Sequence, residues 1–106
     1  IASVAAAARD SDVAVAATAD LLAHPEQAEL VRALAAVRPT ALVSMRSPYD
    51  ALSVPDIPAY VCAYYGRPAA ATAAAELLLG EIPPQGRLPV EVPSLWPIGA
   101  GLQGWE

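Results

Sequence analysis

The residues of this chain best placed for chemistry follow the apolar segment Thr40 to Met45. Arg46, Tyr49 and Asp50 bring a guanidinium, a phenol and a carboxylate together in a short polar stretch. These groups donate and accept the hydrogen bonds by which proteins hold polar ligands. Pro48 lies between them, and because proline lacks a backbone donor it ends any extended structure there. We therefore expect Arg46, Tyr49 and Asp50 to form a loop that faces a substrate.

A purely structural role is the competing interpretation of these three side chains. Arg46 and Asp50 could pair with each other, while Tyr49 caps the core and keeps its hydroxyl in water. The structural role is the more frequent outcome for such residues, and the position of the loop is the argument for function. Residues 40–45 are apolar without alternation, which is typical of a parallel strand covered on both faces, and ligands of open α/β sheets bind at the carboxyl ends of such strands.

The surrounding pattern predicts alternating strands and helices. Pro25 and Pro68 fit the first positions of two helices, and Gly80 fits the left-handed end of the second. This order favours an α/β fold, a flavodoxin-like three-layer sandwich with a mainly parallel sheet, and an incomplete domain. The expected elements are helices at 1–8, 25–38 and 68–80, strands at 13–18, 40–45 and 58–64, and a short helix or turn at 48–54.

The C-terminal quarter has a different composition. Prolines at 89 and 93 confine the segment from Gly86 to a sheet edge or an extended arm, because proline cannot donate to a ladder. The residues after it are rich in glycine and include two tryptophans. We expect a sandwich over residues 1–92 and an extended tail over 93–106 that lies across another surface.

Charge and composition exclude several classes of partner. The net charge is −5 and the isoelectric point is near 4.6. All six basic residues are arginines spread along the chain, so we expect no nucleic-acid and no membrane surface. No apolar stretch is long enough to span a bilayer.

The remaining single candidates give weaker signals. Cys62 is the one cysteine and lies in an apolar run, which favours an inert buried thiol over a nucleophile. His24 precedes a helix and is interpreted as an N-cap or exposed residue, because acid–base catalysis needs a positioned partner. Tyr60 and Tyr64 are interpreted as packing residues, with a sugar-stacking platform as the alternative. No metal cluster and no phosphate-binding glycine loop is visible, so we expect no metal and no cofactor.

Five segments together resemble the second domain of family 3 glycoside hydrolases, in particular the two-domain β-N-acetylhexosaminidases. The resemblance covers most of the chain, and the segments occur in the family's order. They are Ser44-Met-Arg-Ser-Pro-Tyr-Asp, residues 60–65 with Gly66 and Pro68, Glu76-Leu-Leu-Leu-Gly-Glu, Gly86-Arg-Leu-Pro-Val and Gly99-Ala-Gly-Leu. Residues 1–92 then correspond to the latter part of that domain.

The resemblance implies that catalysis takes place elsewhere in a longer protein. In the hexosaminidase branch a barrel aspartate attacks the anomeric carbon, and a histidine on a barrel loop serves as acid and base. That histidine loop has no counterpart in this sequence. A sister branch takes an acid–base glutamate from the second domain, but no burial or charge partner singles out Glu76, Glu81 or Glu91. We expect no catalytic residue in this chain.

The expected partners are therefore an N-terminal catalytic barrel of the same polypeptide and, through it, an amino-sugar glycoside. The resemblance implies an auxiliary domain that buttresses the barrel, with the loop at Arg46 to Asp50 walling the sugar pocket. A non-catalytic interaction or small-molecule binding module on the same scaffold is the alternative. We expect a bacterial parent, cytoplasmic or secreted.

Overall fold

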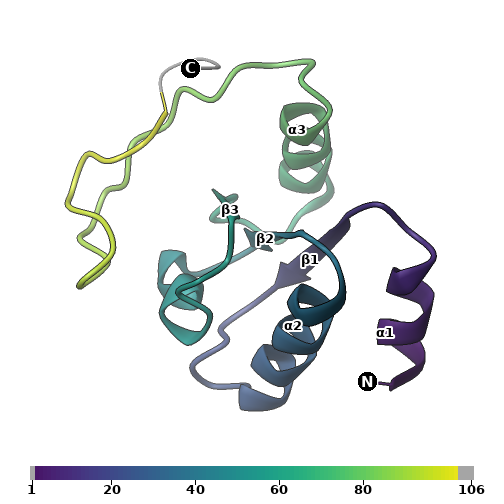
Figure 1. Ribbon diagram of the computed structural model, residues 1–106. Coiled ribbons are helices and arrows are strands. Elements are labelled where there is room, and N and C mark those ends of the chain that lie inside the picture. The colour runs from purple at the N-terminus through teal and green to yellow at the C-terminus, as the bar shows by residue number, and fades with distance from the viewer. Residues whose placement is uncertain (1, 103–106) are drawn as a thin grey trace.

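The computed structural model describes residues 2–102, which form an α/β domain with helices on both faces of a parallel sheet (Figure 1). The expected fold class is confirmed, and the elements begin and end close to the predicted positions. In chain order they are α1 (Ala2–Arg9), β1 (Ala14–Thr18), α2 (Pro25–Val37), β2 (Thr40–Ser44), the 3₁₀ helix η1 (Pro48–Ser53), β3 (Ala59–Cys62) and α3 (Pro68–Leu78).

The three strands are parallel and lie in the order β1-β2-β3, so β2 is central. Thr18 aligns with Ser44, and Ser44 aligns with Cys62, which places the carboxyl ends of all three strands at the same level. Leu42 and Val43 of β2 are buried on opposite faces. The uninterrupted apolar pattern of residues 40–45 is thereby explained by helices above and below the strand.

Helices α1 and α2 cover one face of the sheet, and α3 lies on the other (Figure 1). Pro25 begins α2, where a missing backbone donor costs nothing, and Glu26 lies in the first turn. One face of α2 buries Ala28, Val31 and Leu34 against the sheet. Full burial of a side chain such as Val31 contributes about 1.5–3 kcal/mol, so this face supplies much of the core.

Helix α3 ends just before Gly80, as the sequence predicted. Gly80 has a φ of +79°, and the amide of Glu81 donates to the carbonyl of Glu76 at 2.8 Å. This six-to-one hydrogen bond is that of a Schellman motif, which satisfies a carbonyl that the helix end leaves unpaired. Only Ala74 of α3 is buried, and most of the helix surface is exposed.

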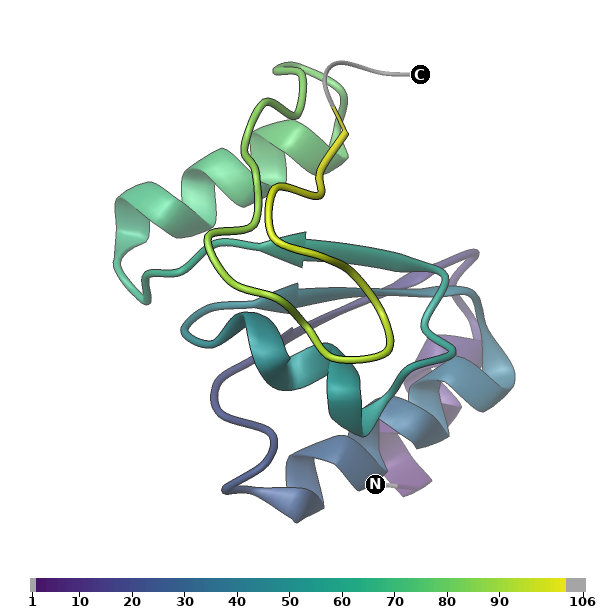
Figure 2. The same ribbon diagram turned by 90° about the vertical axis from the view of Figure 1, so that its left-hand side faces the viewer.

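The C-terminal segment is an extended arm rather than an edge strand of the sheet (Figure 2). Leu88 exchanges two 2.8 Å backbone hydrogen bonds with Gly99 and Ala100, so the arm folds back on itself. Val92 and Trp96 form an isolated antiparallel bridge at its tip. The prolines explain this outcome, because they remove the donors that a strand would need. Trp105 of the expected tail lies outside the described residues, and the division at residue 92 stays a prediction.

Within residues 2–102, none of the helices has the length and apolar character that crossing a membrane requires.

Candidate functional site

Asp50 lies inside the domain and not on its rim. Its side chain is in the first turn of η1, and the residue is 1% exposed. The Thr18 hydroxyl donates to Oδ2 at 2.7 Å, and the Leu21 amide donates to Oδ1 at 3.0 Å. Both carboxylate oxygens are thus occupied by donors from the end of β1 and the loop after it. Asp50 therefore positions the loop. In this geometry its carboxylate faces the interior and not a substrate.

Arg46 is the exposed cation at the same edge of the sheet. Its Nη1 lies 3.2 Å from Oδ2 of Asp20, and 68% of its side chain is exposed. The expected structural pairing of Arg46 with Asp50 does not occur, because Asp50 is turned inward. Asp20 has a left-handed φ of +55°, which an aspartate tolerates better than most residues. The pair is solvated, so it contributes at most about 1 kcal/mol and leaves Arg46 able to reorient.

The turn between these residues is held by local hydrogen bonds. Ser47 caps η1, because its Oγ accepts a 3.1 Å hydrogen bond from the Tyr49 amide. The Tyr60 hydroxyl donates to the carbonyl of Pro48 at 2.6 Å, which joins β3 to the same turn. Tyr49 itself is half-buried. Arg46 and Tyr49 are therefore carried on a fixed turn at the carboxyl ends of the strands, and the substrate-facing role of this loop stays a prediction.

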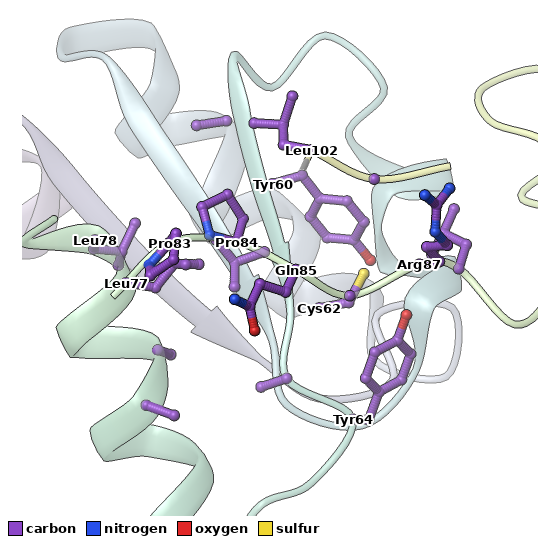
Figure 3. Close-up of a pocket in the computed structure, with 18 of the residues that line it drawn as sticks. Tyr60, Cys62, Tyr64, Leu77, Leu78, Pro83, Pro84, Gln85, Arg87 and Leu102 are labelled. Carbon is purple, nitrogen blue, oxygen red and sulfur yellow. The ribbon is translucent and has the colours of Figure 1, made fainter. Parts of the chain in front are cut away.

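A hollow among the described residues lies elsewhere in the domain. A cavity of about 810 Å³ opens between β3, α3 and the C-terminal arm, and its walls are mostly apolar (Figure 3). Tyr60, Cys62 and Tyr64 project into it from β3 and the residues after it, and Arg87 reaches it from the arm. Arg46, Tyr49 and Asp50 do not line it. The polar turn and the cavity are thus two separate features.

The tyrosines of the cavity are phenols that resist ionisation. Burial raises the pKa of Tyr60 well above its ordinary value of 10; the Ser44 hydroxyl acts to lower this pKa, and the Cys62 thiol acts to raise it. Burial also raises the pKa of Tyr64, and the Cys62 thiol beside it acts in the same direction. The ring of Tyr60 stacks on Trp96 of the arm, with centroids 5.6 Å apart and planes inclined by 13°. Both tyrosines can donate hydrogen bonds at neutral pH, and neither can act as a base there.

Residues 1–97 match the glycosyl hydrolase family 3 C-terminal domain. The chain belongs to this family. Among solved structures it is similar to a protein described as a fungal multi-domain GH3 β-N-acetylglucosaminidase with a GCN5-related glucosamine N-acetyltransferase region. The sequences are 26% identical, the TM-score is 0.83, and the match covers 91% of this chain and 12% of that one. A comparison with curated proteins found no match.

The acidic and histidine side chains of this family 3 domain that the structure describes are not gathered around the cavity. No aspartate, glutamate or histidine is among the described residues that line the cavity. Retaining and inverting glycosidases need two such groups on opposite sides of the scissile bond. Glu81 and Glu91 are exposed, and Glu76 lies half-buried on α3. Within residues 2–102, no three histidine, cysteine, aspartate or glutamate side chains are grouped so that they could hold a metal ion.

The four weaker sequence candidates have defined positions. His24 makes no side-chain capping bond at the start of α2, and its Nδ1 lies 3.5 Å from Glu26. Cys62 is half-buried and not fully enclosed, because β3 borders the cavity. Tyr64 lies beyond the end of β3 with a φ of +62°, so regular strand alternation does not relate it to Tyr60. Tyr60 packs against the core and against Trp96.

Sequence reasoning missed Asp20 and Trp96 in this family 3 domain. Asp20 follows β1 as Arg46 follows β2, so alignment of the two strand ends could have paired them. No comparable feature of the sequence indicated that Trp96 would contact Tyr60. It lies 36 residues after Tyr60 in a segment without regular structure, and only the path of the arm brings the two rings together.

Proposed function

We propose that this chain is the auxiliary C-terminal domain of a family 3 β-N-acetylglucosaminidase. In this proposal the domain buttresses a catalytic barrel of the same polypeptide and supplies no catalytic group. The observation that carries the proposal is the structural similarity to a fungal GH3 β-N-acetylglucosaminidase over 91% of this chain. The chain spans only 12% of that protein's length, so the activity of such an enzyme would reside mainly outside this segment.

The construction of the domain supports a buttressing role. Asp50 ties η1 to the loop after β1, and Tyr60 ties β3 to the same turn. These bonds join η1 to the end of β1 and to β3, which restrains the turn that η1 begins. A rigid edge is what a wall of a substrate pocket requires, because a binding group must keep its position when the substrate arrives.

Arg46 is the group through which this edge would contact the sugar. Its guanidinium is exposed and lies beside Asp20 at the carboxyl end of the sheet. Five N–H donors make arginine suited to the hydroxyl and amide oxygens of an N-acetylated sugar. Tyr49, three residues later on the fixed turn, would add an aromatic surface beside it.

The experiment is a substrate comparison with the intact enzyme that contains this chain. Aryl N-acetyl-β-glucosaminide and aryl β-glucoside carry the same leaving group and differ only at carbon 2 of the sugar. We expect chromophore release from the N-acetylated substrate with at least tenfold higher kcat/KM. Equal or greater activity on the plain glucoside would contradict the hexosaminidase assignment. Release of chromophore by residues 1–106 alone would contradict the auxiliary role.

The cavity favours a second candidate function, that of a small-molecule binding module. A largely apolar space of about 810 Å³ with the phenol of Tyr64 on its wall has the size and character of many ligand pockets. This alternative predicts an intact parent protein without activity on either aryl glycoside. It also predicts that Tyr64→Phe weakens ligand binding while Arg46→Ala does not.

A further inference from the structure

The cavity between β3, α3 and the C-terminal arm has a single charged side chain on its described wall. Among the described residues that line it, only Arg87 carries a formal charge at neutral pH. Its Nη1 donates to the carbonyl of Gly99 at 3.3 Å, and the residue is exposed. An arginine carries five N–H donors, so this bond leaves others for a ligand. The cavity therefore offers a positive group where it opens to solvent.

Polar and apolar side chains lie towards opposite ends of this cavity (Figure 3). Tyr64 and Arg87 are at one end, which we call the polar end. The other end, the apolar end, is formed by Leu77 and Leu78 of α3 and by Pro83 of the segment that follows the helix. A ligand that is complementary to both ends must itself have a charged end and an apolar body.

The Tyr64 phenol is a second hydrogen-bond donor at the polar end. Burial raises the pKa of Tyr64, so the phenol keeps its proton at neutral pH. The Tyr60 hydroxyl, by contrast, is already used, because it donates to the Pro48 carbonyl at 2.6 Å. A guanidinium and a phenol that both donate are suited to an anionic oxygen group, which accepts hydrogen bonds and carries the opposite charge.

The walls of the cavity expose apolar side chains that a ligand would cover. Leu78 is 38% exposed and Leu102 is 52% exposed, and both line the cavity. Covering apolar surface is favourable by about 25 cal/mol for each Å² removed from water. Contiguous exposed apolar surface of this kind often marks a ligand-binding groove. The apolar body of a ligand therefore supplies the larger part of the binding free energy, and the charged end supplies selectivity.

The same walls disfavour other classes of ligand. An unmodified sugar would bury its hydroxyls against apolar side chains, and a buried hydroxyl without a hydrogen-bond partner is costly. A cation would find no carboxylate among the described residues that line the cavity. The volume of about 810 Å³ lies in the range of pockets that hold small organic molecules.

We propose that this cavity binds a small amphipathic carboxylate. Its anionic group would accept hydrogen bonds from Arg87 and Tyr64, and its apolar body would lie against the leucines of α3. The proposal names a ligand class for the cavity and holds whether or not the intact enzyme cleaves glycosides. Arg46 has no part in it, because that residue does not line the cavity.

Cys62 reports whether the cavity is occupied. It is the one cysteine of the sequence and lies half-buried on the cavity wall. In the intact enzyme, its alkylation by N-ethylmaleimide is followed by mass spectrometry of the peptide that contains it. We expect saturating decanoate, an alkyl carboxylate, to slow this alkylation several-fold. Alkylation at the same rate with and without decanoate would overturn the proposal. A Cys62 that the reagent cannot reach in the intact enzyme would also overturn it, because the cavity would then be filled by another part of the protein.

A neutral probe isolates the contribution of the charge. Decanol has the same chain length as decanoate and lacks the carboxylate. We expect Arg87→Gln to raise the concentration of decanoate needed for half-protection of Cys62 by about three- to fivefold, the effect of a solvent-exposed ion pair, and to leave that of decanol unchanged. Arg67→Gln removes an arginine that lies over the Tyr65 ring and does not line the cavity, so it should change neither concentration. An equal effect of Arg87→Gln on both probes, or of both variants on decanoate, would refute recognition of an anion by Arg87.

Discussion

The hydroxyl of Thr18 donates a 2.7 Å hydrogen bond to the carboxylate of Asp50, 32 residues later in the chain. Both residues are buried, and the second carboxylate oxygen accepts from the Leu21 amide. A carboxylate is costly to bury unless it is hydrogen-bonded, and here both oxygens are. The bond fixes the turn that carries Arg46 and Tyr49 against the end of β1.

Asp50→Ala should destabilise the domain. It would leave the Thr18 hydroxyl and the Leu21 amide without their acceptor, and hydrogen bonds to charged groups are worth about 1.5–3 kcal/mol. We expect the free energy of unfolding in urea to fall by about 2–3 kcal/mol. Asp56→Ala, at an exposed position, is the control and should change it by less than about 0.5 kcal/mol. Equal effects of the two variants would show that Asp50 does not hold the turn.

Arg46→Ala should weaken substrate binding by the intact enzyme and leave the fold unchanged. Arg46 is exposed and its ion pair with Asp20 is solvated, so little stability is lost with it. We expect KM for the aryl N-acetyl-β-glucosaminide to rise at least threefold. Arg67→Ala removes another exposed arginine, one that lies over the Tyr65 ring, and should leave KM unchanged. Unchanged kinetic constants in Arg46→Ala would remove this loop from the substrate pocket.

Gly101→Ala should open the C-terminal arm. A Cβ at Gly101 would collide with the backbone carbonyl oxygen of Gly86, which cannot yield as a flexible side chain can. We expect the amides of Leu88 and Gly99, which close the arm, to exchange with solvent faster by about tenfold or more. Gly66→Ala meets nothing within 4 Å and serves as the control. Retention of the arm's hydrogen bonds in Gly101→Ala would contradict this account.

Tyr60 should keep its proton at a pH where ordinary tyrosines lose theirs. Burial raises its pKa in the folded state, whereas in the unfolded chain the phenol titrates near 10. The folded state then binds the proton more tightly, so this contribution to stability is complete below about pH 10 and is lost as the pH rises further. The tyrosinate absorbance of the native chain minus that of Tyr60→Phe isolates the group. A difference curve with its midpoint at or below pH 10 would contradict the burial argument.

Local sequence signals were enough for the elements of the fold. Pro25 and Pro68 begin helices, Gly80 ends one, and the run from Thr40 to Ser44 is a strand buried on both faces. Each of these outcomes follows from steric and hydrogen-bonding preferences that operate within a few residues. The prolines at positions 89 and 93 were local signals too, but they left both a sheet edge and an extended arm open, and only the structure shows that the segment is an arm.

The sequence by itself thus determined which segments are strands and helices, and that a guanidinium, a phenol and a carboxylate follow the central strand. Only the tertiary structure decided that Asp50 turns inward to Thr18, that Arg46 pairs with Asp20, and that Trp96 stacks on Tyr60. The physical reason is distance along the chain. Which side chains meet across 26 to 36 residues depends on strand register and on the path of the arm, and neither is encoded by neighbouring residues alone.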